Sequence, residues 1–363
     1  MKLSSRKRVG VLGAGQLALM LAQAAETLGV DVICAGSAGD CAGQAAPVIE
    51  VDLNDAEAVR AFAAQVDLVT VESENIDGAV LKAVNVFPNA RAIGIAQDRL
   101  MEKRFFTQCG LGVAPYAPVD TLADLKLAME TIGLPAILKT RRMGYDGKGQ
   151  VRLQRNEEAD AAWAEVGGVP CILEGMVRFD AEASLIAARA LSGKIVFYPL
   201  IQNFHREGIL RTSIAPYANA TMQQLAETYM TTVMERLEYI GVLAIEFFVA
   251  EGKLLANEMA PRVHNSGHWT IEGSKTSQFE NHLRAIAGME LGDTVSEPAV
   301  MLNCIGTMPP LEETLKFPML HRHDYGKAAR PGRKVGHLTF AATEKAAIAE
   351  WQMRLEQTSV DVA

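Results

Sequence analysis

The sequence has few of the features that mark several common protein classes. Its five cysteines, at positions 34, 41, 109, 171 and 304, are odd in number and lack the paired CxxC spacing of a zinc site. We therefore expect reduced thiols rather than a disulfide framework. Aromatic residues make up only 6% of the chain, and no apolar run reaches the ~20 residues of a membrane span. These features favour a cytoplasmic protein with no membrane partner.

An excess of basic residues is also missing. The net charge of −8 disfavours a nucleic-acid partner, so any basic cluster is expected to be a local anion site. The start, MKLSSRKRVGVL, resembles a signal peptide, but Gly13-Ala14-Gly15-Gln16 interrupts the apolar run, which disfavours secretion. A chain of 363 residues is too long for one core and predicts two or three domains.

The first hundred residues alternate between strand and helix patterns. We expect strands at 8–12, 31–34, 49–51, 68–71 and 92–95, a helix that residues 13–18 open and that runs to about 28, and helices at about 55–64 and 78–84. This alternation predicts a parallel sheet covered by helices. The GxGxxA turn at Gly13 lacks the acidic residue that a nicotinamide cofactor needs after the second strand, but the helix start could still hold an anion. Glu72–Asn75 follows a strand, either as a ligand site or as a solvated loop.

The middle of the chain joins a lysine strand to a glycine-rich segment. A helix at 98–110 carries Arg99 and Lys103, a second helix is expected at 122–132, and the strand 136–140 ends near Lys139. Residues 141–150, RRMGYDGKGQ, combine glycines with basic groups and could cover phosphates, or form a solvated basic hairpin. The sequence GxxxxGK[ST] is absent, so a P-loop is excluded.

Next comes a strand, 172–177, containing Glu174, which could read an exocyclic amine and a neighbouring ring nitrogen. A hairpin at 182–189 and 195–198 follows, then polar residues 203–213 around His205, and a helix at about 222–240. A helix is also expected at 278–287. The strand-rich tail from about 299 contains YGKAARPGRKVGH (325–337), a basic loop that either holds a phosphate or is solvated.

Residues 242–265, VLAIEFFVAEGKLLANEMAPRVHN, form the most informative stretch. We expect a hairpin whose three-residue loop is centred on Gly252, with Glu246 opposite Glu258 and Phe248 opposite Ala256. Its other face would hold Ile245, Phe247, Val249, Leu255 and Met259. Two opposed carboxylates without a basic neighbour on the strands need a raised pKa or a divalent cation such as Mg²⁺. A hairpin with exposed glutamates is the alternative.

These parts, in this order, resemble the ATP-grasp superfamily. Within it, KTRRMGYDGKGQ, ILEGMV, HREGILRTSIAP, NEMAPRVHNSGHWT and YGKAARPGRKVGH resemble the 5-(carboxyamino)imidazole ribonucleotide synthase family over nearly the whole chain. The resemblance implies an α/β and α+β fold: a Rossmann-like parallel-sheet (pre-ATP-grasp) domain at 1–98, an ATP-grasp domain at 99–296 with a lid at about 112–175, and a small β-rich C-terminal region at 297–363. It also implies a homodimer.

Site residues are carried over position by position. The resemblance implies ATP contacts from Arg99, Lys139, Gly144, Tyr145, Asp146, Gly147, Lys148, Gly149, Gln150, Glu174, Val177, Glu182, His205, Asn257 and Glu258. It implies substrate contacts from Gln16, Glu74, Tyr145, Asp146, Lys148, Arg262, His264, Asn265, Ser266, Lys327 and Arg333. Mg²⁺ would be bound by Glu246 and Glu258, and the expected catalytic residues are Lys139, Asp146, Lys148, Arg262 and His264.

The resemblance implies ATP-dependent carboxylation of aminoimidazole ribonucleotide by bicarbonate through carboxyphosphate. Asp146 and His264 are candidates to take the amine proton. The sequence departs from the family pattern at Met143, where glycine is usual, and at Ser73, where an aromatic residue is usual. Three alternatives are another ATP-grasp carboxylase or ligase acting through an acyl phosphate, a nucleotide-sensing protein on the same fold, and, least favoured, a dehydrogenase.

Overall fold

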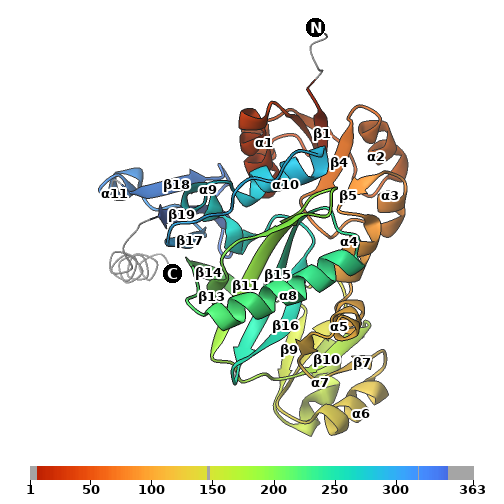
Figure 1. Ribbon diagram of the computed structural model, residues 1–363. Helices are drawn as coiled ribbons and strands as arrows, with labels where there is room; N and C mark the ends of the chain where they lie inside the picture. The colour runs from red at the N-terminus through yellow and green to blue at the C-terminus, as the bar shows by residue number, and fades with distance from the viewer. Residues whose placement is uncertain (1–5, 145–147, 318, 342–363) are drawn as a thin grey trace.

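The computed structural model describes residues 6–144, 148–317 and 319–341. This part of the chain contains a sheet of five strands, one of four and one of ten. The largest sheet lies between the other two (Figure 1). Among the described residues, no helix is both long and apolar enough to cross a membrane.

The N-terminal sheet is parallel, as the alternating pattern predicts. Its strands lie in the order β3 (Val48–Glu50), β2 (Asp31–Gly36), β1 (Arg8–Leu12), β4 (Leu68–Val71) and β5 (Val86–Phe87). Between them run α1 (Gln16–Leu28), η1 (Cys41–Gln44), α2 (Ala56–Ala63) and α3 (Gly78–Lys82), and α4 (Ala90–Ala96) follows β5. The polar loop after β4 therefore lies at the carboxyl edge of the sheet.

One predicted strand is wrong. Residues 92–95 belong to helix α4, and the fifth strand is the two-residue β5 upstream of it. The reason is local turn chemistry, because the side chain of Asn89 accepts a hydrogen bond from the N–H of Ala92 and so caps the helix. A short apolar run does not distinguish strand from helix by periodicity alone.

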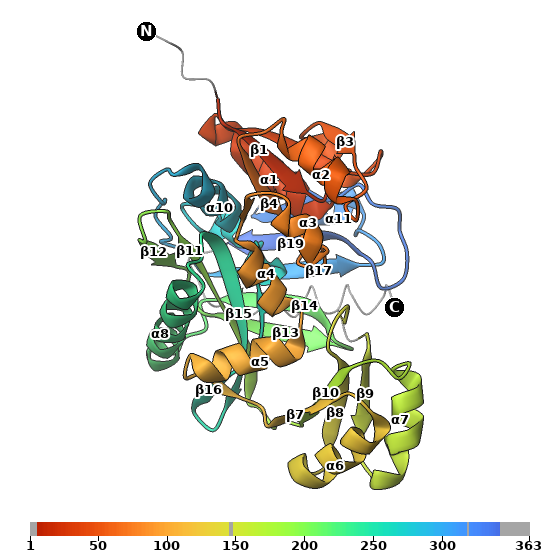
Figure 2. The ribbon, with the colours of Figure 1, turned by 90° about the vertical axis from the view of Figure 1, so that its right-hand side faces the viewer.

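The four-stranded antiparallel sheet forms a small lobe with its own core. Its order is β7 (Tyr116–Val119), β10 (Cys171–Gly175), β8 (Ala136–Thr140) and β9 (Gln150–Leu153). Helices α6 (Leu122–Ile132) and α7 (Ala159–Glu165), with η2 (Asn156–Glu158), accompany it, and α5 (Arg99–Gln108) leads into it. Figure 2 shows this lobe projecting from the rest of the chain. Buried residues of β8, β10, α6 and α7 form one cluster that gives the lobe its own core.

The largest sheet includes the C-terminal strands. Its path is β18 (Leu320–Asp324), β19 (Lys334–Ala341), β17 (Ala299–Ile305), β14 (Ile209–Ala215), β13 (Ile201–Arg206), β11 (Ala181–Arg189), β15 (Gly241–Ala250), β16 (Lys253–Ala260) and β6 (Gly112–Val113), with β12 (Ile195–Phe197) paired to β11. Its helices are α8 (Ala220–Arg236), η3 (Asn265–Gly267), α9 (Thr270–Gly273), α10 (Gln278–Ala287) and α11 (Leu311–Thr314). The predicted strand-rich tail is confirmed and extends this sheet.

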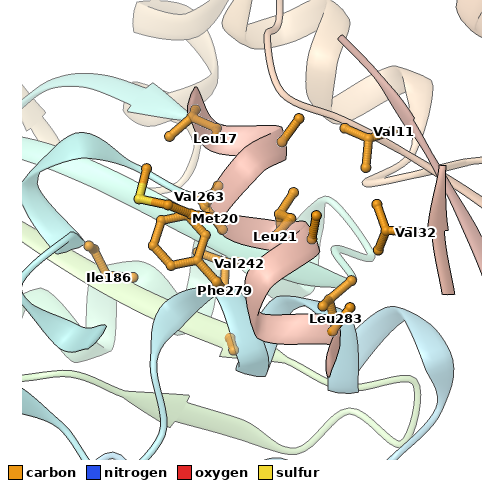
Figure 3. Packing of buried hydrophobic residues seen from close by; sticks show 14 of the residues in the cluster. Val11, Leu17, Met20, Leu21, Val32, Ile186, Val242, Val263, Phe279 and Leu283 are labelled. Carbon is orange, nitrogen blue, oxygen red and sulfur yellow. The ribbon is translucent and has the colours of Figure 1, made fainter. Parts of the chain in front are cut away.

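Alternate residues of the central strands bury against different helices. Leu243 and Ile245 belong to the core cluster that contains α8, whereas Val242 and Ala244 belong to the cluster that contains α1 and α10. Figure 3 shows Leu17, Met20 and Leu21 of α1 between Val11 and Val32 of the first sheet and Phe279 and Leu283 of α10. The N-terminal sheet is thus packed onto the large sheet through α1.

The hairpin of β15 and β16 confirms the key pair but not the predicted loop. Glu246 lies opposite Glu258, yet Ala250 pairs with Lys253, so the turn contains only Glu251 and Gly252. A bulge between Glu246 and Phe247 leaves Asn257 without a partner and restores the register, so Phe248 pairs with Leu255 rather than Ala256. The buried face accordingly contains Leu254, which is 1% exposed, in place of the predicted Leu255.

Candidate active site

A cavity of about 320 Å³ lies where the three sheets meet. Ten predicted site residues line it: Gln16, Glu74, Arg99, Gly144, His205, Glu246, Glu258, Arg262, His264 and Asn265. They come from the α1 start, the β4 loop, α5, the β8–β9 connection, β13, the hairpin and the segment after β16. The fold therefore brings together residues that are far apart in the sequence.

The two opposed glutamates have different neighbours. Arg99 Nη1 lies 2.8 Å from Glu258 Oε2 and forms an ion pair with it, while the Nε2 of His264 lies 3.4 Å from Glu246 Oε1. Burial, and secondarily the charge of Glu258, raise the pKa of Glu246 to about 7. Burial would also raise the pKa of Glu258, but the charge and hydrogen bond of Arg99 outweigh it and lower that pKa. Glu258 thus has a direct arginine counter-charge, whereas the positive neighbours of Glu246 do not offset its burial.

The donor set around this pair fits Mg²⁺ in part. Two carboxylates face the same cavity, and the buried Oδ1 of Asn257 and Oδ1 of Asn265 have no hydrogen-bond partner among the described residues. Among the residues that the structure describes, no group of three or more His, Cys, Asp or Glu side chains is placed so that it could hold a metal ion by itself. Mg²⁺ is commonly bound by one or two carboxylates with water and substrate phosphates completing the shell. The residues present therefore suit a cation that arrives with a phosphate ligand.

Helix α5 holds the hairpin edge on both sides of Glu258. Lys103 Nζ donates to the carbonyl of Asn257 at 2.8 Å and that of Ala256 at 3.4 Å, and the N–H of Met259 donates to Glu102 Oε1 at 2.7 Å. Lys103 and Glu102 are buried, at 1% and 2% exposed. Sequence reasoning assigned them no role. The signal was their spacing, since positions three and four after Arg99 share its helix face.

The lysine strand and the hinge strand meet in a buried ion pair. Lys139 Nζ lies 2.9 Å from Glu174 Oε2, and Lys103 Nζ lies 3.5 Å from the same oxygen. Burial alone would raise the pKa of Glu174, but Lys103 and Lys139 outweigh it and lower the pKa to about 2. Glu174 Oε1 is buried without a partner among the described residues, so it is available as an acceptor for an amine.

Glu182 and His205 form a second contact near the cavity. The Oε2 of Glu182 lies 3.0 Å from the Nδ1 of His205, at hydrogen-bond distance. Burial would lower the pKa of His205, but the hydrogen bond that its Nδ1–H donates to Glu182, with the charges of nearby glutamates, outweighs burial and raises that pKa. The predicted pair of ATP-contacting residues thus lies together, next to the hairpin. Val177 follows the hinge strand β10 and is half-buried.

Glu74 and Arg262 contact each other across two sheets. Arg262 Nε donates to Glu74 Oε2 at 2.6 Å and Nη2 donates to Oε1 at 3.1 Å. Lys327 Nζ donates to the Oε1 of Gln16, which links the C-terminal basic loop to the start of α1. Arg333 Nη1 instead donates to the carbonyl of Ala328 in its own loop, at 3.3 Å. Four of these five predicted substrate residues therefore join different regions of the chain.

The anion cradle predicted at the start of α1 is filled by the protein itself. The N–H groups of Gly15 and Ala18 donate to Glu72 Oε1 and Oε2, at 2.8 and 3.1 Å. A Cβ at Gly13 would lie 2.2 Å from Glu72 Cγ, which explains the glycine there. The N–H groups expected to form an anion site therefore bind an internal carboxylate, which is a group that a helix N-terminus favours.

The remaining predicted residues are those of the glycine-rich segment and Ser266, next to His264. Lys148, Gly149 and Gln150 are exposed at the start of β9. Tyr145, Asp146 and Gly147 lie outside the described residues. The base of this segment is fixed, because Arg141 donates twice to Asp98, at 3.0 and 2.8 Å. Ser266 is buried beside His264. Burial, with the charge of Arg262, lowers the pKa of His264 well below its ordinary value.

Comparison with known families divides the chain into three regions. Residues 6–97 match the ribonucleotide synthetase preATP-grasp domain, residues 104–279 the ATP-grasp domain, and residues 299–350 the phosphoribosylaminoimidazole carboxylase C-terminal domain. The N5-carboxyaminoimidazole ribonucleotide synthase of Pseudomonas aeruginosa is 49% identical over 348 residues, covering 94% of this chain and 96% of that protein. The Escherichia coli protein of the same name is 42% identical, covering 93% and 91%.

Solved structures agree with this assignment. The N5-carboxyaminoimidazole ribonucleotide synthetase of Thermus thermophilus superimposes with a TM-score of 0.92 and 46% identity, over 96% of this chain and 98% of that one. An Aspergillus clavatus synthase in complex with ADP and 5-aminoimidazole ribonucleotide gives 0.89 and 28% identity, over 97% and 98%. The resemblance inferred from the motifs is confirmed: the chain belongs to the N5-carboxyaminoimidazole ribonucleotide synthase family of ATP-grasp enzymes.

Proposed function

We propose that this chain carries out the reaction for which its family is named. ATP activates bicarbonate, and the activated carboxyl group is transferred to the amine of 5-aminoimidazole ribonucleotide, giving 5-(carboxyamino)imidazole ribonucleotide, ADP and phosphate. The observation that carries the proposal is the opposed pair Glu246 and Glu258, facing a cavity that residues of all three sheets line. Family membership indicates the reaction. The two carboxylates would hold the cation that neutralises the triphosphate.

The chemistry requires activation because bicarbonate is a poor electrophile. Its oxygen attacks the γ-phosphorus of ATP, ADP leaves, and carboxyphosphate forms. The amine of the ribonucleotide then attacks the carboxyl carbon, directly or after release of CO₂, and phosphate leaves with the C–O electron pair. Catalysis of phosphoryl transfer rests mainly on positioning and charge neutralisation. Mg²⁺, when bound, would supply much of that neutralisation, and Glu246 and Glu258 would hold it.

The protein's own residues divide the remaining work. Lys139 and Glu174 lie together at the hinge, where we place the adenine and the ATP phosphates nearest to it. Glu182 and His205 would lie along the ATP between the hinge and the hairpin. Arg99 binds the Oε2 of Glu258. Arg262, Gln16 and Lys327 would face the ribonucleotide on the side of the N-terminal sheet. The catalytic roles of Lys148 and Asp146 stay predictions.

A coupled ADP assay tests the substrate assignment. ADP formation at full rate should require bicarbonate and the ribonucleotide together, since capture of carboxyphosphate drives turnover. Unchanged ADP production when the ribonucleotide is omitted would count against this substrate. It would favour the alternative, another ATP-grasp carboxylase or ligase acting through an acyl phosphate, and a screen of amine acceptors would then identify it.

The metal assignment has a separate test. Glu258→Ala should lower ADP formation by roughly 10²-fold or more, as for loss of other preorganised charge-stabilising groups, with the fold retained. Glu251→Ala, in the exposed turn of the same hairpin, is the matched control and should keep wild-type activity. Near-wild-type phosphate release from Glu258→Ala would remove the metal assignment.

Two further properties belong to this proposal. We place the protein in the cytoplasm, on the strength of five free thiols and of relatives that are biosynthetic enzymes. We also expect a homodimer, as the family resemblance implies. Sedimentation equilibrium of the purified chain tests the second point, and a mass of a single chain at micromolar concentration would contradict it.

A further inference from the structure

A row of buried polar side chains crosses the large sheet beside the cavity. Ser213 of β14 pairs with Asn203 of β13, and Ser184 of β11 pairs with Glu246 of β15, which pairs with Glu258. Ser184, Asn203 and Ser213 are 0%, 3% and 0% exposed. The ATP-grasp mechanism outlined above assigns none of these three a role. Burying polar groups costs free energy unless they are hydrogen-bonded, so the row needs an explanation.

The row is a single chain of hydrogen bonds that ends at His264. Ser213 Oγ donates to Asn203 Oδ1 at 2.8 Å, and Asn203 Nδ2 donates to Ser184 Oγ at 2.9 Å. Ser184 Oγ lies 2.8 Å from Ser266 Oγ, and Ser266 Oγ lies 2.9 Å from His264 Nδ1. The chain therefore connects β14, β13, β11 and η3 to a side chain in the cavity wall.

The direction of the chain is set at its histidine end. The backbone N–H of Ser266 donates to His264 Nδ1 at 3.3 Å, so Nδ1 presents a lone pair and carries no proton. The hydroxyl of Ser266 faces the same lone pair and must donate to it. Ser266 Oγ then accepts from Ser184, whose oxygen accepts from Asn203. Each hydroxyl donates once, in the same direction, and none is left without an acceptor.

This direction fixes the tautomer of His264. An imidazole without a proton on Nδ1 carries it on Nε2, and that nitrogen lies 3.4 Å from Glu246 Oε1. The N–H faces a carboxylate oxygen, which is the favourable arrangement. Both nitrogens are then committed: Nδ1 accepts from Ser266, and Nε2 has no lone pair to offer. Neither nitrogen of His264 then presents a free lone pair to an incoming amine.

We propose that Ser213, Asn203, Ser184 and Ser266 are positioning residues that fix the Nε2–H tautomer of His264, so that His264 orients the metal-facing carboxylate of Glu246 instead of receiving the amine proton. The proposal deepens the proposed function and rests on it for the role of Glu246. Fixing a carboxylate through the hydrogen bonds of its neighbours is a common way to tune a metal site.

The tautomer can be read directly, without substrate or metal. Protein labelled with ¹⁵N-histidine would be examined by long-range ¹H–¹⁵N correlation, and the His264 signals identified by their loss in His264→Asn. We expect Nε2 to show the protonated pattern and Nδ1 the unprotonated one at neutral pH. A proton on Nδ1 in the wild-type protein overturns the proposal, whatever any variant does.

Two variants test the chain itself. Ser266→Ala should shift His264 towards a mixture of tautomers and weaken Mg²⁺ binding in the presence of ADP about fivefold, the value of one ordinary hydrogen bond. Asn203→Leu, further along the chain, should have the same effect to a smaller degree. Thr270→Val is the matched control, since Thr270 Oγ1 is also fully buried and hydrogen-bonded, to Gly267 and Gln278, but lies outside the chain.

The outcomes separate this proposal from the proposed function. Wild-type tautomer and Mg²⁺ affinity in Ser266→Ala would show that the chain merely fills the sheet, and would overturn the proposal while the ADP assay stands. Conversely, failure of the ribonucleotide requirement in the ADP assay would leave the tautomer result intact. Loss of Mg²⁺ affinity in Thr270→Val to the same degree would also contradict the proposal, because the effect would then come from general loosening of the segment.

Discussion

The two glutamates of the hairpin illustrate how neighbours decide the charge of a residue. Both are acids at opposed positions, yet Arg99 contacts only Glu258. Glu246 has His264 as its neighbour, and burial keeps that imidazole neutral by lowering its pKa. The uncompensated carboxylate is therefore the one whose pKa rises, and it is the group that a cation would neutralise.

This difference predicts how pH affects the metal-free protein. Between the ordinary pKa of 4.5 and the native value of about 7, Glu246 holds a proton that the unfolded chain has released. Its contribution to the free energy of unfolding is therefore present below this window and is lost as the pH rises through it. Glu246→Gln should remove that part of the pH dependence. Urea unfolding at pH 5 and pH 7.5 measures it, because other groups cancel in the difference between the two proteins.

An equal change in unfolding free energy between the two pH values for wild type and Glu246→Gln would contradict this account. Glu280→Gln is a suitable control, since Glu280 is a partly buried helix residue whose ion pair is with Arg284 of its own helix. The free energy of unfolding of Glu280→Gln should change between pH 5 and pH 7.5 by the same amount as that of the wild type, because Glu246 is still present.

At Met143, the backbone explains why glycine is usual in the family and why methionine is strained. Its φ is 63°, in the left-handed region, where glycine is favoured, and its side chain is 72% exposed. A left-handed residue with a Cβ costs about 1–2 kcal/mol. Met143→Gly should therefore be more stable than Met143→Ala by about 1 kcal/mol, since both remove the side chain but only glycine relieves the strain. Chemical unfolding of the two variants measures it, and equal stability would contradict the strain.

At the scale of the element, the sequence predicts those helices and strands that have clear end signals. The helices at 122–132 and 278–287 have the predicted bounds, and each begins with a hydroxyl cap, Thr121 and Ser277. The strand 136–140 also has its predicted bounds. Residues 92–95 were assigned to a strand because a short apolar run is equally consistent with strand and helix, even though Asn89 caps α4. Elements are predictable where local signals agree.

The hairpin turn was not predictable in the same way. The prediction that Glu246 lies opposite Glu258 is confirmed. A two-residue turn with a bulge produces this pairing as well as a three-residue loop does. What decides between them lies on another element: Lys103 of α5 binds the carbonyls at the bulge, and Glu102 binds the N–H beyond it. A bulge that is stabilised by tertiary contacts leaves no signal in its own strand.

Helix α5 therefore gives a prediction of its own. Lys103→Met keeps the size of the side chain but leaves the carbonyls of Ala256 and Asn257 without their donor, which should cost about 1–3 kcal/mol of stability. Because Glu258 lies next to the bulge, and because Lys103 also pairs with Glu174, the KM for Mg·ATP should rise about tenfold, with a smaller change in kcat. Thermal unfolding and the ADP assay measure the two effects.

Lys126→Met is the control for this experiment. Lys126 is a half-exposed lysine of α6 that pairs with Asp160 in the small lobe, and its loss should leave both quantities near wild type. A wild-type KM in a folded Lys103→Met protein would show that α5 does not position the hairpin. Glu102→Leu, on the other side of Glu258, then tests the second contact separately.

At the scale of the whole molecule, the site exists only because three regions meet. The motifs predicted which residues belong together, and ten of them line one cavity. Sequence did not predict their partners: that Glu74 binds Arg262, that Lys327 binds Gln16, or that Glu72 fills the start of α1. These contacts join residues between 54 and 311 positions apart, and no local pattern specifies them.

The pair of Glu74 and Arg262 allows a prediction that separates positioning from substrate contact. If Glu74 mainly fixes the guanidinium of Arg262, Glu74→Gln should lower kcat/KM for the ribonucleotide about tenfold, the value of a hydrogen bond to a charged group. Arg262→Gln should lower it further, and the double variant should lose no more than Arg262→Gln alone. If Glu74 binds the ribonucleotide independently, the two losses should instead add. The exposed pair Lys275 and Asp293 serves as a control, because neutralising either residue should leave kcat/KM unchanged.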